Sequence, residues 1–160
     1  MVKVAVIGPG MMGRGIAACL AAGGPHEVRL YGRRKEAAQD GVGKAGELME
    51  FMVKNGVAAQ EQGRIIATDS LKEAVTGAEF VFESISEDLK AKQALFGELE
   101  KLADASAVLC TNTSSLSVSA ISSGCQGSAA DRVVAAHFIG PAHLVPLVEL
   151  CPSARAAAAA

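Results

Sequence analysis

The 160-residue sequence lacks an excess of positive charge. Its 15 Lys and Arg residues stand against 17 Asp and Glu residues, which gives a formal net charge of −2. Neutralising nucleic-acid phosphates needs clustered positive charge, so we expect no nucleic-acid partner. No uncharged apolar run approaches the ~18–20 residues that a membrane helix requires, and no signal peptide precedes the first strand-like segment. These absences predict a cytoplasmic protein without membrane contact.

The four cysteines lack the clustering of a disulfide framework or a zinc site. Cys19, Cys110, Cys125 and Cys151 form no C-x-x-C pair, and no histidine stands at ligand spacing from them. We therefore expect reduced thiols that pack as small apolar side chains, and no metal site.

Strand-like and helix-like segments alternate along the sequence from its first residues. Half of the residues are apolar and a fifth are charged, a composition typical of a globular domain. Strands joined by crossover helices predict an α/β fold with a doubly wound, mostly parallel sheet and helices on both faces. We expect strands at 2–7, 27–31, 64–67, 79–82 together with Ile85, 107–111, 132–138 and 147–151, and helices at 11–22, 35–55, 71–75, 88–103 and 118–122.

A glycine-rich loop joins the first strand to the first helix in a G-x-G-x-x-G pattern. Gly8 would permit a tight turn, Gly10 would let the backbone approach a pyrophosphate, and Gly13 would allow the helix to pack closely. The helix N-terminus adds free N–H groups for the phosphates. This context predicts a Rossmann-type dinucleotide site, against the alternative of a plain glycine-rich turn. The loop residues are Gly8, Pro9, Gly10, Met11, Met12 and Gly13.

The end of the second strand lacks the carboxylate that usually selects NAD. NAD-specific domains place Asp or Glu there to bind the ribose 2′-hydroxyl, whereas this sequence continues with Gly32, Arg33 and Arg34. Guanidinium groups suit a 2′-phosphate, so Gly32 and Arg33 indicate that NADP is a possible cofactor beside NAD. The alternatives are a solvated helix start or an arginine that stacks on adenine.

Four stretches, in order, resemble the N-terminal NAD-binding domain of the L-3-hydroxyacyl-CoA dehydrogenase family. They are 3–17 with the glycine loop, 82–92, 111–116, and His137-Phe138 followed by Glu149. The resemblance implies an NAD-dependent oxidoreductase of fatty acid β-oxidation that interconverts L-3-hydroxyacyl-CoA and 3-ketoacyl-CoA. It also implies that His137 is the general base, that Glu149 orients it, and that Ser114 binds the reacting oxygen.

The residues themselves allow this chemistry at the expected place. His137 ends a strand, at the sheet edge where doubly wound folds bind ligands. Imidazole has an ordinary pKa of ~6.5, which suits a general base. A histidine with a purely structural role is the alternative for His137.

By resemblance, three further residues contact the cofactor near the nicotinamide. These are Asn112, Glu87 and Lys92, the last two on the side of the ribose. The alternatives are a helix-capping sequence at 111–115, and a helix start matched to the dipole with a solvated lysine. Glu83, at a strand end, has no firm role.

The sequence departs from the family in ways that leave its function open. The family commonly has Asn-Pro after its His-aromatic-aromatic run, whereas this chain reads His137-Phe138-Ile139-Gly140-Pro141, and the family's helical C-terminal domain is absent. We therefore expect a dinucleotide-binding domain at 1–152, with 153–160 an artefact or the start of a missing domain. The isolated chain would then bind cofactor but turn over acyl-CoA poorly, and the full-length enzyme would be a homodimer. The alternatives are a dehydrogenase of another 3-hydroxy acid (a sugar acid or a carnitine-like substrate) and a non-catalytic module that senses the dinucleotide.

Overall fold

The computed structural model describes residues 1–159, which alternate between strands and helices from the N-terminus onward. The strands are β1 (Lys3–Ile7), β2 (Glu27–Tyr31), β3 (Arg64–Thr68), β4 (Phe80–Glu83), β5 (Val108–Thr111), β6 (Val133–Phe138) and β7 (Val148–Pro152). The helices are α1 (Met11–Ala22), α2 (Lys35–Lys54), α3 (Leu71–Val75), α4 (Leu89–Leu102), α5 (Val118–Ser122), the 3-10 helix η1 (Ser128–Arg132) and α6 (Ala154–Ala159).

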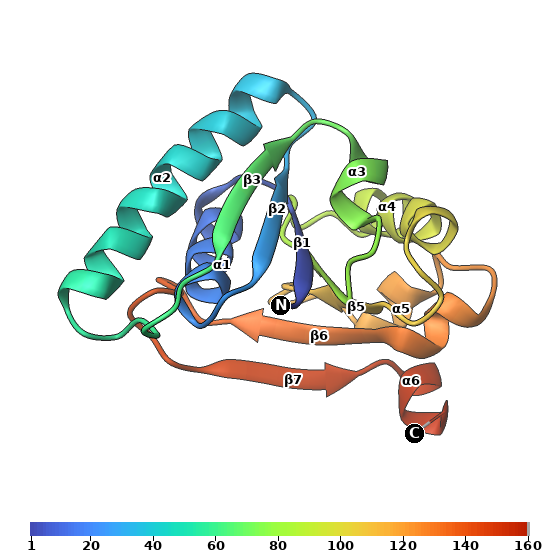
Figure 1. Ribbon diagram of the computed structural model, residues 1–160. Coiled ribbons are helices and arrows are strands. Elements are labelled where there is room, and N and C mark those ends of the chain that lie inside the picture. Colours follow the sequence, from blue (N-terminus) through green and yellow to red (C-terminus); the bar gives the residue numbers. More distant parts are fainter. Residues whose placement is uncertain (160) are drawn as a thin grey trace.

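All seven strands form one sheet in the order β3-β2-β1-β4-β5-β6-β7 (Figure 1). The first six are parallel, and only β7 runs antiparallel, against β6. The order of these six strands is that of the doubly wound dinucleotide-binding fold, in which the chain changes direction across the sheet between β1 and β4. The structure therefore confirms the predicted Rossmann-type fold.

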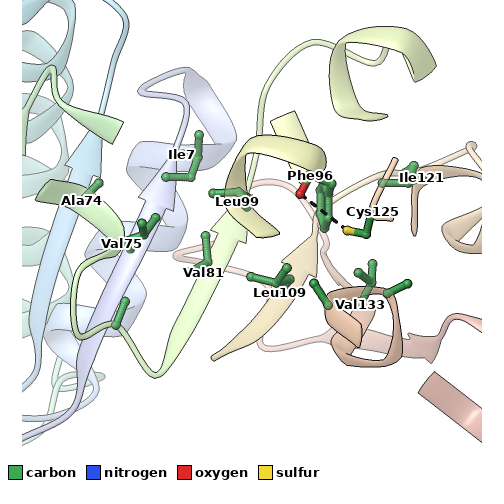
Figure 2. Close-up of a cluster of buried hydrophobic side chains, with 14 residues drawn as sticks. Ile7, Ala74, Val75, Val81, Phe96, Leu99, Leu109, Ile121, Cys125 and Val133 are labelled. Carbon is green, nitrogen blue, oxygen red and sulfur yellow. Dashed lines mark hydrogen bonds between the residues drawn. The ribbon is translucent and has the colours of Figure 1, made fainter. Parts of the chain in front are cut away.

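Helices cover both faces of the sheet, as the sequence predicts. Helices α1 and α2 pack on one face over a cluster that includes Val6, Ile16 and Leu30. On the other face, α3, α4 and α5 cover a second cluster around Phe96 and Leu109 (Figure 2). The central strands are buried on both sides, which explains their nearly continuous apolar sequences.

Local side chains determine where several helices begin. Ser70, Asp88 and Ser117 stand directly before α3, α4 and α5, and each side chain accepts a hydrogen bond from a backbone N–H in the first turn. The predicted helix at 88–103 therefore begins one residue later, because Asp88 is its cap. The fourth strand also differs from the prediction, since it ends at Glu83 and includes neither Glu79 nor Ile85.

Residues 154–159, for which the sequence predicts no helix or strand, form α6. Ser153 is fully buried and its Oγ accepts the Ala156 N–H at 3.0 Å, while Arg155 Nε donates to Asp131 at 2.8 Å. Alanine has the highest helix propensity, which accounts for the helix. The assignment of 153–160 as an artefact or a domain start stays a prediction, and Ala160 lies outside the described residues.

The predicted packing of the cysteines as small apolar side chains holds for buried Cys110 and Cys125 and in part for Cys19, but it is wrong for Cys151, which is exposed on the edge strand β7. All four are free, and burial raises the pKa of the Cys110 thiol to about 12 and that of the Cys19 and Cys125 thiols to about 11. Thiols that stay protonated are poor nucleophiles and poor metal ligands. Within residues 1–159 no cluster of His, Cys, Asp and Glu could hold a metal ion, and no helix is both long and apolar enough to cross a bilayer.

Candidate active site

The glycine loop lies at the carboxyl ends of the neighbouring strands β1 and β4, and its three glycines have different surroundings. Gly8 has φ +110°, and a Cβ there would lie 2.4 Å from the Ser84 carbonyl oxygen. At Gly13 a Cβ would lie only 1.8 Å from the Gly8 oxygen, so this residue lets α1 approach the loop. A Cβ at Gly10 would touch no protein atom within 4 Å. Side chains at Gly8 and Gly13 would therefore clash with the protein, whereas the backbone at Gly10 borders open space.

Two cavities adjoin at this open point. The first, of about 470 Å³, lies between the glycine loop, the end of β2 and α4. The second, of about 380 Å³, is lined by Met11, Met12, Glu87, Asn112 and Ser114. Gly10 lines both cavities, so a side chain there would project into the space they share. This two-part space beside a helix N-terminus fits a dinucleotide with its pyrophosphate at Gly10.

The end of β2 forms one wall of the first cavity. Gly32 and Arg33 line this cavity, whereas Arg34 does not. Within residues 1–159 neither arginine side chain makes a hydrogen bond or an ion pair. A Cβ on Gly32 would lie 3.0 Å from Pro9 Cγ and 3.1 Å from the Ala38 nitrogen, tighter than ordinary contacts. The tight packing therefore disfavours any side chain at the position after β2, a carboxylate included.

Ser114, His137 and Glu149 form a continuous hydrogen-bonded chain. His137 Nδ1 lies 2.8 Å from Glu149 Oε2, and His137 Nε2 lies 3.0 Å from Ser114 Oγ. The antiparallel pairing of β6 and β7 places Glu149 directly opposite His137. When Nδ1 carries the proton and donates it to the carboxylate, Nε2 is the unprotonated nitrogen that can accept a proton. It faces Ser114, which lines the second cavity. The structure thus brings together the three residues that the sequence predicts as catalytic.

Asn112 connects the carboxyl ends of β5 and β6, beside the hydrogen bonds that join Ser114, His137 and Glu149. Its Oδ1 accepts the Phe138 N–H at 2.8 Å, so it links the end of β5 to the residue after His137. Asn112 also lines the second cavity, and its predicted place near the nicotinamide stays a prediction.

Lys92 is buried, in contrast to the alternative that it is a solvated lysine near the start of a helix. Its side chain is only 1% exposed, and its Nζ lies 2.6 Å from Glu83 and 3.3 Å from Glu87. The solvated-lysine alternative is therefore wrong, because the ammonium group is held between two carboxylates. The predicted contact of Lys92 with the cofactor ribose stays a prediction.

Glu83 is the residue of this region that the sequence analysis leaves without a role. It is fully buried, and it accepts hydrogen bonds from Lys92 Nζ (2.6 Å), the Ile85 N–H (2.7 Å) and Thr111 Oγ1 (2.6 Å). A carboxylate that ends a buried apolar strand is costly unless it is paired. The place of Glu83 at the end of an apolar strand therefore indicated that its carboxylate is paired, but the sequence could not identify the partners.

Glu87 holds the loop that carries Ser114. One carboxylate oxygen accepts hydrogen bonds from Thr113 Oγ1 (2.5 Å), the Ser114 N–H (2.9 Å) and the Ser115 N–H (3.1 Å). Partial burial raises the pKa of Glu87, but these hydrogen bonds and the Lys92 charge outweigh it and lower the pKa to about 2.

The low pKa of Glu87 predicts a pH-dependent contribution to stability. A carboxyl group whose pKa falls on folding stabilises the fold fully above its unfolded pKa, and the contribution is lost as the pH falls through the folded pKa. We expect the free energy of unfolding of wild type to exceed that of Glu87→Gln above pH 4.5, with the gap closing towards pH 2. Urea titrations at several pH values measure this gap. The exposed Glu47, on α2, provides the control Glu47→Gln, and a gap that persists at pH 2 would contradict the prediction.

Comparisons with known proteins agree with this geometry. A sequence profile described as "3-hydroxyacyl-CoA dehydrogenase, NAD binding domain" matches residues 3–160. The chain is 33% identical over 152 residues to a peroxisomal fatty acid beta-oxidation multifunctional protein of Arabidopsis thaliana, covering 92% of this chain and 21% of that protein. It is 36% identical over 152 residues to 3-hydroxyadipyl-CoA dehydrogenase of Escherichia coli K12, with 92% and 31% covered.

A solved structure agrees as well. The crystal structure of 3-hydroxybutyryl-CoA dehydrogenase from Escherichia coli K12 superposes with a TM-score of 0.81 at 33% identity, covering 93% of this chain and 32% of that one. The chain therefore spans about a fifth to a third of the length of these three relatives. Since the profile covers nearly the whole sequence, the chain belongs to the NAD-binding domain family of the 3-hydroxyacyl-CoA dehydrogenases.

Proposed function

We propose that this domain carries the NAD-dependent interconversion of L-3-hydroxyacyl-CoA and 3-ketoacyl-CoA. The observation that carries the proposal is the chain of Ser114, His137 and Glu149 beside the second cavity, with distances of 3.0 and 2.8 Å. The adjoining first cavity and the open backbone at Gly10 fit the rest of a dinucleotide.

The three side chains divide the proton chemistry among them. When bound, NAD supplies the acceptor for the hydride that leaves the hydroxyl-bearing carbon. His137 Nε2 takes the proton of the 3-hydroxyl group, and Ser114 Oγ donates a hydrogen bond to the same oxygen. Glu149 holds the Nδ1 proton and stabilises the imidazolium ion that forms. In the reverse direction His137 returns the proton to the oxygen of the ketone.

The same geometry weighs against a module that only senses the dinucleotide. Sensing needs the glycine loop, but it does not need a proton acceptor backed by a carboxylate. A dehydrogenase of another 3-hydroxy acid would use the same three side chains, since they act on the hydroxyl group and not on the thioester.

An assay with matched substrates separates these functions. We expect oxidation of L-3-hydroxybutyryl-CoA with NAD, followed by the absorbance of the reduced nicotinamide, and no oxidation of the D isomer. The rate should be slow for the isolated chain. Equal efficiency with free 3-hydroxybutyrate would favour a different 3-hydroxy acid. NAD binding without turnover of any of these compounds, in a form that contains a complete substrate domain, would favour a sensor.

We also propose that the domain tolerates NADP, because Arg33 faces the first cavity and no carboxylate stands after β2. A charge-assisted hydrogen bond from Arg33 to a 2′-phosphate would change affinity by about ten- to a hundredfold. Arg33→Ala should therefore weaken NADP binding by that factor and leave NAD binding nearly unchanged, as measured by calorimetric titration.

Arg34→Ala is the matched control, since Arg34 does not line the cavity. Equal NADP affinity in wild type and Arg33→Ala would show that the arginines are only a solvated helix start. Gly32→Asp is a poor test, because the tight packing around Gly32 would disturb the loop as well. A cytoplasmic location and a homodimer of the full-length enzyme stay predictions.

A further inference from the structure

A buried charged network lies behind the catalytic loop. Glu83 on β4 and Lys92 on α4 are 0% and 1% exposed at their side chains and 2.6 Å apart. Breaking such a buried pair is costly, but the pair itself gains little stability over apolar residues, since desolvation offsets the attraction. Its place at the carboxyl end of β4 therefore needs a reason other than stability.

The network leads through Glu87 to Ser114. Lys92 Nζ faces Oε2 of Glu87 at 3.3 Å, which leaves Oε1 of the same carboxylate for the N–H groups of Ser114 and Ser115. Ser114 Oγ then lies 3.0 Å from His137 Nε2. The two carboxylate oxygens of Glu87 thus have different partners: Oε2 contacts the buried ammonium group of Lys92, and Oε1 accepts the hydrogen bonds of the loop that carries Ser114.

Glu83 determines where that ammonium group lies. Besides Lys92, its carboxylate accepts the Ile85 N–H and Thr111 Oγ1, at 2.7 and 2.6 Å, so it is fixed to β5 and to the chain that follows β4. We propose that Glu83 is a positioning residue for catalysis: through Lys92 and Glu87 it fixes the loop that places Ser114 against His137. This inference rests on the proposed role of Ser114.

The test compares Glu83→Gln with the double variant in which Lys92→Met is added. The single variant leaves a buried ammonium group with one partner and should lower Tm, whereas the double variant removes both charges and should regain most of the loss. In both variants we expect the Ser114 and Ser115 amides to exchange hydrogen about tenfold faster or more than in wild type. The Cε1–H signal of His137 should also shift, and both readouts are measured by NMR.

A purely structural role of Glu83 predicts a different result. The double variant would then recover wild-type exchange at Ser114 and Ser115 together with its stability, and this outcome would overturn the proposal. Unchanged exchange in Glu83→Gln would overturn it as well. Glu100→Gln is the matched control, on the helix α4 that carries Lys92: Glu100 accepts the Gln126 and Gly127 N–H groups at 2.8 and 2.6 Å, and its replacement should leave Ser114 unaffected. None of these readouts requires NAD, so a protein that lacked the proposed activity would be recognised separately, in the substrate assay.

Discussion

His137→Gln should lower the rate of 3-hydroxyacyl-CoA oxidation by ~10²–10⁴-fold, the usual contribution of a general base. Glutamine retains a polar side chain but cannot take up the proton, so the loss should fall on turnover and not on NAD affinity. Turnover measured with saturating NAD, in a preparation active on L-3-hydroxybutyryl-CoA, gives the effect. Glu149→Gln should cause a smaller loss, since it removes orientation and charge stabilisation but leaves the base in place.

His143→Gln controls for the general effect of losing an imidazole. His143 lies in the loop between β6 and β7, where its ring meets Phe51 edge-on at 5.9 Å, and it makes no recorded hydrogen bond to the catalytic chain within residues 1–159. Its replacement should leave turnover nearly unchanged. If His137→Gln retained most of the activity, the assignment of the general base would be wrong.

Gly8→Ala should abolish measurable NAD binding and also destabilise the fold. A non-glycine residue at φ +110° is strained, and its Cβ would lie 2.4 Å from the Ser84 oxygen and push β1 and β4 apart. Strain and overpacking together should lower the free energy of unfolding by about 3 kcal/mol. Urea denaturation and calorimetric titration with NAD measure the two effects.

Substitutions at two other glycines distinguish an effect on NAD binding from an effect on stability. Gly10→Ala should weaken NAD binding with a much smaller loss of stability than Gly8→Ala, because its Cβ would meet no protein atom but would project into the shared cavity space, and only the N-cap of α1 is weakened. Gly43→Ala, at an exposed position inside α2 with open space around it, should stabilise the protein by about 0.5–1 kcal/mol. NAD binding that survives in both Gly8→Ala and Gly10→Ala would contradict the assignment of the loop as the pyrophosphate site.

Features determined within a short stretch of chain were predictable from the sequence. The close approach of Gly13 to Gly8 depends on residues five apart and on a strand and a helix that follow each other directly, whereas the contact of Gly8 with Ser84 is not local. The order of strands and helices follows from apolar runs and glycine punctuation. The sequence also contains the information for the antiparallel orientation of β7, because the connection after Phe138 is too short for the crossover that a parallel strand requires.

The roles of the charged residues at the site depend on contacts between distant parts of the chain. Glu83 and Thr111 are 28 positions apart, and Glu87 and Ser114 are 27 apart, so no local pattern could show that each pair is joined. Likewise, the sequence could not show which of two adjacent arginines faces a cavity. Local steric limits and periodicity therefore determined the fold and the dinucleotide loop in the sequence itself. Only the packing of β4, β5 and α4 against one another decided that Lys92 is buried between Glu83 and Glu87.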